Sequence, residues 1–443
     1  MKKRVCVVIF ATIVLVTMLF SCGKGSGDND LPDVNSASVP GSSKTTITLG
    51  IIDLNTMFEV DYTMRYVSEF NQVNQNYIIE VVRYAEDDLI RLRTELLTGR
   101  GPDIIYSLYY NDSVLAPVMN RGILADLWPY IDADPDINRE DFFQNILHAM
   151  QSPDGTLQVI ANQFFALTLI SIPDIISDTE SLTTNRFLDV IQRAIHAGVT
   201  YPMDEYWTGI DFFVFMLSHV DLGIIDISSG TSNFESQVVY DLLELASLLP
   251  GEVTLEPDYS LNARMTRGEQ LFRFDYIVTP NSIARYETLL EEYTILGLPS
   301  DEGSLHSAVM RSYLGINANS DHPDAAWSFI RRYLLPASHM DVRSGLPMRV
   351  DLFDKQIELA MSGLETWILI DGGLEIPMNT LTEKGANQLR DIVDSISYIS
   401  SPNDVIANII REELPAFFAG RRTAEEVAAV IQNRVQMYLH ERG

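Results

Sequence analysis

An alternation of strand-like and helix-like segments over residues 45–110 restricts the fold more than any other property of this sequence. The stretches 45–52 (TTITLGII), 77–84 (YIIEVVRY) and 102–110 (PDIIYSLYY) are rich in β-branched and aromatic residues, as strands are. Between them, residues 61–73 and 87–98 place apolar side chains at helical steps, and Gly99 supplies a stop. This order and spacing predict βαβ units and a parallel sheet. The pattern leaves the order of the strands open.

The rest of the chain continues the mixed α/β pattern. Strand-like runs such as 163–171 (QFFALTLIS) and 293–299 (YTILGLP) are interspersed with helical runs such as 187–198 (FLDVIQRAIHAG). Helices dominate near the end, and no internal repeat of fixed period is present. With 443 residues, the chain is long enough for two or more domains.

The first 22 residues have the plan of an export signal. Lys2, Lys3 and Arg4 form a basic head, residues 5–20 are almost entirely apolar, and Ser21–Cys22 ends the run. The apolar run is slightly shorter than the roughly 20 residues that span a bilayer. We therefore interpret residues 1–21 as a secretory signal.

The end of this signal, Leu19-Phe20-Ser21-Cys22, resembles the lipobox of bacterial lipoproteins. The resemblance implies cleavage before Cys22, whose sulfur and new amino group would then carry lipid such as palmitate. An ordinary signal with an incidental cysteine is the alternative. Residues 22–44 are small and polar, and they predict a disordered tether with a reach of about 25 Å.

Charge and cysteine content exclude several functions. The formal net charge is −30, whereas binding to nucleic acid needs a basic surface. The two cysteines are Cys6 and Cys22, so the folded part has no thiol for a disulfide or a cysteine metal site. Stability must therefore come from the apolar core.

Five later parts of the chain carry a further signal. In order they are TGRGPDIIY with LAPVMNRGILADLWPYID, DGTLQVIANQFF, LFRFDYIVTPNSIARYE with YTILGLPSDEGS, LGINANSDHPDAAWSFIRRYLL, and SGLPMRVDLFDKQI. Together they resemble the extracellular solute-binding proteins that supply ATP-binding-cassette (ABC) importers, in particular the maltose-binding-like group that takes oligosaccharides. Their order along the chain is more specific than any one of them.

The resemblance implies a two-lobed, periplasmic-binding-protein-like α/β fold with three hinge crossovers. Residues 45–162 and 305–345 would form the N-terminal lobe, and residues 163–304 and 346–443 the C-terminal lobe. It further implies a carbohydrate held between the lobes, delivery to the permease subunits of an ABC importer, and no catalysis or cofactor. We expect a monomer that is lipid-anchored at the outer face of the bacterial cytoplasmic membrane.

A sugar-binding cleft needs flat aromatic platforms beside hydrogen-bonding groups. The candidates that follow predicted strands are Asp53, Asn55, Tyr109, Tyr110, Asn111 and Asp112, for which strand ends and helix caps are the alternative roles. Trp207 lies between helical stretches, and Phe164, with its neighbour Phe165, falls at the first crossover; packing is the alternative for all three. Tyr276, Arg311, Tyr313 and Trp367 are candidates through the resemblance. By contrast, we expect Trp128 and Trp327 to be core residues.

Other signals are weaker. Residues 132–143 (DADPDINREDFF) alternate oxygen ligands as a calcium loop does, but position six is Ile137 and position twelve is Phe143, which favours a solvated loop. The sequence contains no HExxH motif, no phosphate-binding P-loop and no GxSxG elbow. A surface enzyme acting on polysaccharide and a solute-sensing subunit of a membrane signalling system remain alternatives. A peptide, polyamine or anion ligand is also left open.

Overall fold

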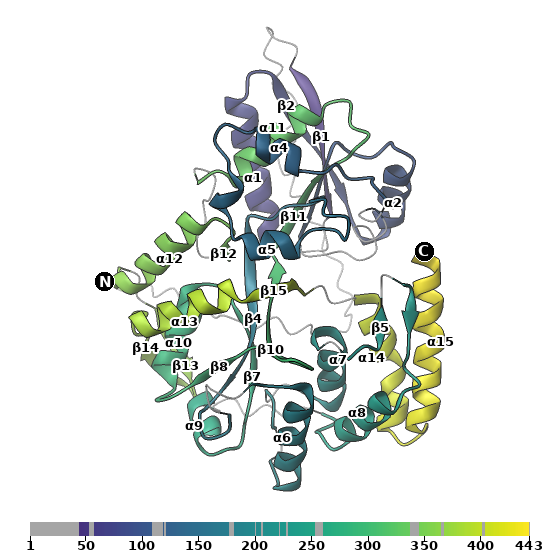
Figure 1. Cartoon of the computed structure of the whole chain (residues 1–443), viewed down its shortest axis with the longest axis vertical. Coiled ribbons are helices and arrows are strands. Elements are labelled where there is room, and N and C mark those ends of the chain that lie inside the picture. The colour runs from purple at the N-terminus through teal and green to yellow at the C-terminus, as the bar shows by residue number, and fades with distance from the viewer. Residues whose placement is uncertain are drawn as a thin grey trace, which may run out of the picture. The chain divides into compact units, whose positions relative to one another are not determined.

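Four strands form the first sheet. β1 (Thr45–Ile52) lies between β2 (Tyr77–Tyr84) and β3 (Ile104–Leu108), and it runs parallel to both. The fourth strand, β11 (Ser312–Ile316), comes from much later in the chain and pairs antiparallel with β3, giving the order β11-β3-β1-β2. Figure 1 labels β1, β2 and β11 of this sheet. The predicted parallel βαβ sheet is confirmed, with one antiparallel edge strand added.

Three helices pack with this sheet through apolar side chains. They are α1 (Met57–Val73), α2 (Leu89–Leu97) and α11 (Pro323–Leu334). Phe329 of α11 contacts Tyr66 and Phe70 of α1, with ring centroids 5.0 Å and 5.3 Å apart. On α2, Leu92 and Leu96 are fully buried, as the helical period predicts.

The second sheet is organised around one long strand, β4 (Gln163–Ser171). β7 (Arg273–Ile277), β8 (Thr294–Leu296), β10 (Gly303–Met310) and β12 (Leu346–Pro347) all pair antiparallel with it. β10 also pairs with β9 (Leu298–Ser300) and, in parallel, with β15 (Ile396–Ile399). The second sheet is therefore largely antiparallel.

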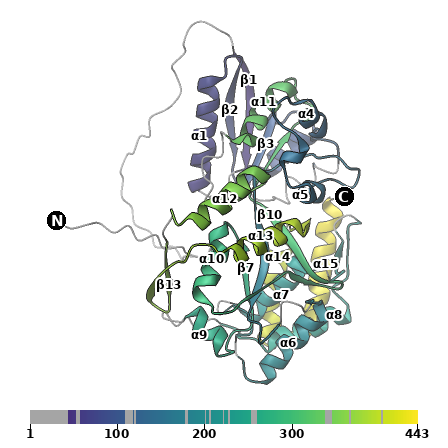
Figure 2. The ribbon, with the colours of Figure 1, turned by 60° about the vertical axis from the view of Figure 1, so that its left-hand side comes forward.

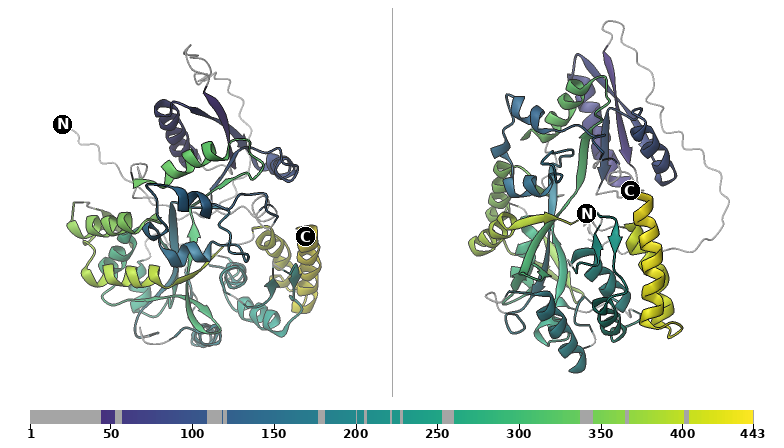
Figure 3. Two further views of the ribbon diagram at one scale, coloured as in Figure 1. Left: turned by 45° about the horizontal axis from the view of Figure 1, so that its top comes forward. Right: turned by 45° about the vertical axis from the view of Figure 1, so that its right-hand side comes forward.

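Helices cover both faces of β4, whose side chains alternate between two hydrophobic cores. Leu167 and Leu169 join the core that contains α6 (Thr184–His196), α7 (Gly209–His219), α8 (Gln237–Ser247), α14 (Asp404–Phe418) and α15 (Ala424–Arg442). Ala166 and Ile170 join the other core, with α9 (Leu261–Thr266), α10 (Pro280–Leu289), α12 (Val350–Ser362) and α13 (Glu383–Asp394). Figure 3 shows α15, in yellow, packed along α14.

The remaining elements are short. They are α4 (Trp128–Ala133), α5 (Gln144–Ala149), the hairpins β5 (Ile225–Asp226) with β6 (Thr231–Ser232) and β13 (Ile368–Asp371) with β14 (Leu374–Pro377), and 3₁₀ turns at Glu86–Asp88 and Arg139–Asp141. The β13–β14 hairpin stands at the edge of the ribbon in Figure 2. It carries the exposed aliphatic side chains Ile368, Ile370 and Leu374.

The chain passes between the two sheets three times. Ile160 bridges to Leu314 of β11 just before β4 begins. Arg311 alone separates β10 in the second sheet from β11 in the first. The last passage runs from α11, which packs on the first sheet, to β12 in the second.

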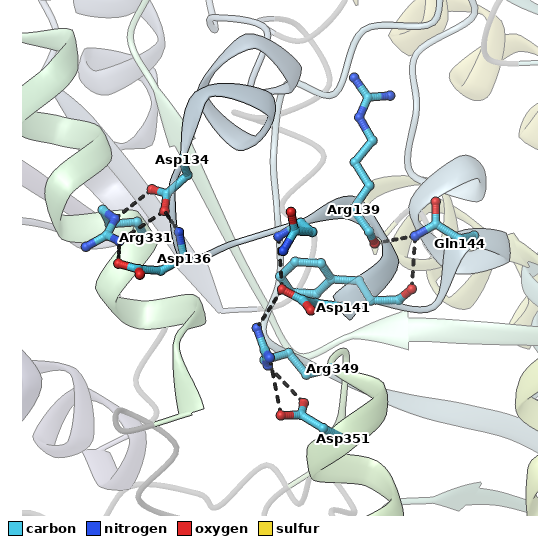
Figure 4. A network of polar contacts seen from close by, with 10 residues as sticks. Asp134, Asp136, Arg139, Asp141, Gln144, Arg331, Arg349 and Asp351 are labelled. Carbon is cyan, nitrogen blue, oxygen red and sulfur yellow. Dashed lines mark hydrogen bonds and ion pairs between the residues drawn. The ribbon is translucent and has the colours of Figure 1, made fainter.

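The acidic run at residues 132–143 is held by arginines from distant segments (Figure 4). Asp134 accepts hydrogen bonds from Arg331 Nε at 2.6 Å and from Trp327 Nε1 at 2.9 Å, and Asp136 accepts one from Arg331 at 2.6 Å. The side chain of Asp134 is only 2% exposed. The prediction of a solvated loop is therefore wrong at Asp134, because its carboxylate is desolvated against a guanidinium.

The same run is fixed at its other end by the start of α12. Arg349, which is 8% exposed, donates to Asp141 at 3.3 Å and to Asp351 at 2.9 Å (Figure 4). Within the described residues, no group of three or more His, Cys, Asp or Glu side chains could hold a metal ion.

These statements concern the residues that the computed structural model describes: 44–52, 57–108, 118, 121–176, 181–199, 201–204, 207–220, 222–226, 229–252, 260–336, 345–364, 367–400 and 404–442. Residues Lys44–Gly443 form one compact unit. The predicted signal, Cys22 and all but the last residue of the tether lie outside the described residues, as do six candidates: Asp53, Asn55, Tyr109, Tyr110, Asn111 and Asp112.

Candidate aromatic binding site

Five aromatic side chains from three elements form a continuous cluster on one face of the second sheet. They are Phe165 of β4, Phe274 and Tyr276 of β7, Phe215 of α7, and Trp207 just before α7, and they are called the aromatic cluster below. Ring centroids are 4.9 Å apart for Trp207 and Phe215, 5.9 Å for Trp207 and Phe274, and 5.4 Å for Phe274 and Tyr276. Phe165 extends the cluster, 6.3 Å from Tyr276.

Strand alternation explains why these rings share a face. Tyr276 and Phe274 lie opposite Leu167 and Leu169 of β4, whose side chains belong to the core under α7. The intervening Asp275 must then point to the other face. The two aromatic residues of β7 therefore meet α7, while the charged residue does not.

The cluster lies at the edge of the second sheet where the chain passes to the first. Phe165 is near the start of β4, and Tyr276 is near the end of the antiparallel strand β7. β10 ends at this same edge, and Arg311 follows it directly. Arg311 leads into β11, which begins beside Leu108, at the carboxyl end of β3. The carboxyl edge of the first parallel strands is the edge at which α/β sheets bind ligands.

Arg311 is held in place at this junction. Its backbone N–H donates to the carbonyl of Gln163 at 3.1 Å, and its guanidinium donates to Gln163 Oε1 at 2.8 Å. Both contacts fasten the second passage to the start of β4. The segment between β10 and β11 is thus hydrogen-bonded to the start of β4.

The rings of the aromatic cluster differ in exposure. Phe215 is buried and only 3% exposed, Trp207 and Phe274 are half-buried, and Tyr276 is 38% exposed. A large, partly exposed ring supported by other rings is a suitable surface for the apolar face of a ligand. Tyr276 and Trp207 are therefore the best-placed platforms.

A polar group adjoins the aromatic cluster. The imidazole of His219, in the last turn of α7, lies 5.5 Å from the ring of Phe215 and 5.2 Å from that of Phe274. Its Nδ1 is 3.1 Å from Oγ of the fully buried Ser400. Burial lowers the pKa of His219 to about 4, because the charged form loses its hydration. The imidazole is therefore neutral at neutral pH.

A charged network supports β7 from the opposite face. Asp275 accepts hydrogen bonds from Arg285 and from the hydroxyl of Tyr286, both on α10. Arg273 lies between Asp275 at 3.8 Å and Asp204 at 3.5 Å. Burial by itself would raise the pKa of Asp275, but Arg285 and Arg273 together lower it. The network keeps Asp275 ionised and holds the strand that carries Tyr276.

The other predicted site residues lie apart from the aromatic cluster. Phe164 is fully buried and packs against Phe143 at 6.2 Å on the opposite face of β4 from Phe165. Tyr313, in β11, is 4% exposed. Trp367 precedes β13, and its carbonyl accepts from Met378 at the base of the hairpin. Of the predicted residues, the structure brings together Trp207 and Tyr276, while Arg311 lies at the same sheet edge.

Sequence reasoning missed Phe215, Phe274 and His219. A usable signal existed for Phe274, because alternation in LFRFDY places it on the same face as Tyr276. Phe215 and His219 are four residues apart on α7, which puts them on one side of the helix. Nothing local to α7 indicates that this side faces β7.

Comparison with known proteins places the fold but not a close relative. No family model matches the sequence, and no curated protein matches it. Among solved structures, an extracellular solute-binding protein of family 1 from Alicyclobacillus acidocaldarius covers 90% of this chain and 100% of its own, at 14% identity and a TM-score of 0.54. The sugar-binding protein MalE from Xanthomonas citri covers 90% and 98%, at 15% identity and a TM-score of 0.54.

A third similar structure is an ABC substrate-binding protein from Listeria monocytogenes in complex with cycloalternan. It covers 90% of this chain and 100% of its own, at 14% identity and a TM-score of 0.52. These three structures are of binding proteins, and the predicted periplasmic-binding-protein-like α/β fold is confirmed. This chain has the fold of the extracellular solute-binding proteins.

Proposed function

We propose that this protein is an exported solute-binding protein that captures a carbohydrate, most simply an oligosaccharide, and delivers it unchanged to an ABC importer. The ligand would lie between an N-terminal lobe (residues 45–162 and 305–345) and a C-terminal lobe (residues 163–304 and 346–443). The observation that carries the proposal is the aromatic cluster at the sheet edge where the chain passes between the two sheets.

The chemistry of the aromatic cluster supports a sugar. Pyranose rings have apolar C–H faces that stack on Trp and Tyr, and hydroxyl edges that need hydrogen-bonding partners. The half-buried Trp207 and the exposed ring of Tyr276 provide the first, and the carboxylate and amide candidates Asp53, Asn55, Asn111 and Asp112 would provide the second. Among similar structures, the protein from Listeria monocytogenes was solved with cycloalternan, and the one from Arthrobacter globiformis is a cyclic α-maltosyl-1,6-maltose binding protein.

Delivery requires that the ligand favour one arrangement of the two lobes. A ligand with equal affinity for open and closed forms would shift nothing, so contacts from both lobes are needed. On the first lobe, the candidates are Asp53, Asn55, Tyr109, Tyr110, Asn111 and Asp112, which follow β1 and β3 in the sequence. On the second lobe, they are Trp207 and Tyr276.

The place of action follows from the start of the sequence. We propose that residues 1–21 are removed, that Cys22 carries lipid, and that residues 22–44 tether the folded part to the outer face of the cytoplasmic membrane. None of the helices in the described parts of the chain combines the length and the apolar composition that crossing a bilayer requires. The tether would let the protein reach the permease while it stays anchored.

A thermal-shift screen tests the proposed function. A sugar that binds only the native state with a Kd near 1 μM stabilises it by about 2.7 kcal/mol at 100 μM. We expect a rise in Tm with at least one of maltose, maltotriose and cycloalternan, and a smaller rise for Trp207→Ala. Chromatography should recover the sugar unaltered, whereas hydrolysis products would point to a surface enzyme. No response to any sugar in the panel would contradict the proposal.

A further inference from the structure

His219 occupies an unusual position for a partly buried histidine. It ends α7, and its imidazole is flanked by the rings of Phe215 and Phe274, two members of the aromatic cluster. Phe274 in turn contacts both Trp207 and Tyr276. The imidazole is therefore one ring removed from each of the two best-placed stacking platforms.

One nitrogen of the imidazole is fixed and the other is not. Nδ1 lies 3.1 Å from Oγ of Ser400, whose own N–H donates to the carbonyl of Ala308 at 2.7 Å. Ser400 is fully buried, so this contact sets the orientation of the ring. Among the described residues, Nε2 of His219 has no hydrogen-bond partner. A polar atom of this kind is satisfied by water or by a ligand group.

The surroundings keep the imidazole uncharged. Asp275 of β7 pairs with Arg273 and with Arg285 on the opposite face of the sheet. On α7, the carboxylate of Asp211 accepts from Thr208 in the N-terminal capping box. Glu412 and Glu413 of α14 pair with Arg434 of α15. A neutral imidazole offers one N–H donor and one lone pair.

We infer that His219 is a ligand contact in which Nε2 hydrogen-bonds a hydroxyl of the sugar that stacks on Tyr276 and Trp207. This inference rests on the proposed function and adds a residue that sets specificity within it. A hydroxyl both donates and accepts, so it can pair with Nε2 in either tautomer of the imidazole. The hydroxyl of Ser400 has the same adaptability at Nδ1.

The contact would make the site selective for a hydroxyl at one position of the ring. A site built to hydrogen-bond a hydroxyl discriminates strongly against an analogue that lacks it, because its own polar group is then left unpaired. A deoxy sugar lacking that hydroxyl should therefore bind less well than its parent to the wild type. It should bind no worse than its parent to a variant without the imidazole.

Calorimetric titration of His219→Phe, with the sugar that binds best from a panel of maltose, maltotriose and cycloalternan, tests this inference. Phenylalanine keeps the ring contacts with Phe215 and Phe274 and removes the polar atom. We expect Kd to rise about 10-fold or more. His219→Gln, which keeps a donor and an acceptor, should recover part of the affinity and guards against a folding defect in the first variant.

His306→Phe is the matched control. His306 also has its Nδ1 close to a serine hydroxyl, Oγ of Ser395 at 2.8 Å, but it makes none of the contacts of the aromatic cluster. The Kd of His306→Phe for the same sugar should stay within 2-fold of the wild-type value.

The pH profile gives a second readout. Because burial lowers the pKa of His219 to about 4, wild-type affinity should be constant from pH 8 to 6 and fall in more acidic buffer, because a bound sugar excludes water from the imidazolium ion that then forms. His219→Phe should lack that fall. If the wild type binds and His219→Phe binds equally well, the inference is overturned while the proposed function stands. If no sugar in the panel binds the wild type, the proposed function itself fails.

Discussion

Tyr276 is the member of the aromatic cluster that combines ring support with solvent exposure. It is 38% exposed, and the rings of Phe274 and Phe165 lie 5.4 Å and 6.3 Å away. Its backbone N–H donates to Asp275 Oδ1 at 2.9 Å, and Asp275 is itself held by arginines. A ring supported in this way is preorganised, so little conformational entropy is lost when a ligand stacks on it.

Replacing this ring should weaken sugar binding. Losing the apolar area of one aromatic platform is worth about 1–3 kcal/mol, so Tyr276→Ala should raise Kd roughly 10-fold to 100-fold in a calorimetric titration. Tyr276→Phe keeps the stacking surface and should stay within a few-fold of the wild type. An alanine variant that binds as well as the wild type would show that the ligand does not use this ring.

A second residue-scale prediction concerns stability. The Asp134 carboxylate is 2% exposed and bound to Arg331, whereas the Asp132 carboxylate is 52% exposed and bound to Arg139. Asp134→Asn should therefore lower the free energy of unfolding by about 3 kcal/mol, because it leaves a guanidinium without its buried partner. Asp132→Asn, the matched control, should cost less than about 1 kcal/mol. Urea unfolding at pH 7 measures both values, and equal costs would contradict this account.

The difference should also depend on pH. Burial would raise the pKa of Asp134, but hydrogen bonds from Arg331 outweigh that effect and lower it below the ordinary value of 3.8. The stabilisation is therefore complete above pH 3.8 and is lost as the pH falls below it. The difference in the free energy of unfolding between the wild type and Asp134→Asn should therefore become smaller only below about pH 3.8.

The acidic run at residues 132–143 also shows which contacts a local sequence pattern cannot predict. The spacing of Asp132–Phe143 argues against calcium, because the glycine and the bidentate glutamate are missing. The actual partners, Arg331 and Arg349, lie almost two hundred residues away or more. No local pattern connects them, so the burial of Asp134 could not be predicted.

At the scale of elements, α7 connects the aromatic cluster to the helices behind it. Thr208 and Asp211 cap its first turn with a reciprocal capping box, which fixes where the helix starts. Gly209 then lets α7 approach its neighbours, because a Cβ there would lie 2.2 Å from the carbonyl oxygen of Ala246 and 2.7 Å from the ring of Phe418. This close approach fixes the position of α7, and so the positions of Phe215 and His219 relative to β7.

Gly209→Ala should therefore lower both stability and sugar affinity. The added methyl group forces α7 away from α8 and α14, and overpacking of this kind costs about 1–3 kcal/mol. Gly251→Ala is the matched control, because a Cβ at Gly251 meets nothing within 4 Å. Thermal unfolding and calorimetric titration of the two variants check the prediction. If Gly209→Ala and Gly251→Ala had the same Tm, the prediction would be contradicted.

Elements were predicted well where their signals are local. The strands at 45–52 and 77–84 have the predicted bounds. Of the four leucines expected on the buried side of α2, Leu89, Leu92 and Leu96 are buried, whereas Leu97 is 40% exposed. Pairing between distant elements left no such signal. β11 pairs with β3, although β3 precedes it by about two hundred residues in the chain. The strand pattern alone could not predict this pairing.

On the scale of the whole molecule, the chain passes between two sheets three times and brings the carboxyl ends of β1 and β3 to the side where β10 ends. The order of family-like segments along the sequence correctly predicted the fold. It could not identify α7 as the helix that completes the aromatic cluster, because that contact depends on how α7 packs on β7.

The proposed anchor makes a prediction about the intact chain in a bacterial host. Cys22 is the residue that would carry lipid, so the mature wild-type protein should partition into the membrane fraction and incorporate labelled palmitate. Cys22→Ser should do neither, while its sugar affinity stays unchanged because none of the proposed ligand contacts lies in residues 22–44. Palmitate label retained in Cys22→Ser would contradict the assignment of the anchor.

Calorimetric titration of the purified wild type and of Trp207→Ala with maltose, maltotriose and cycloalternan tests whether this protein binds a sugar through the aromatic cluster. The account predicts one site per chain with micromolar or tighter Kd for at least one of these sugars, and at least a 10-fold weaker Kd for the same sugar with Trp207→Ala. Absence of binding heat with the folded wild type, or equal affinity in both proteins, would contradict it.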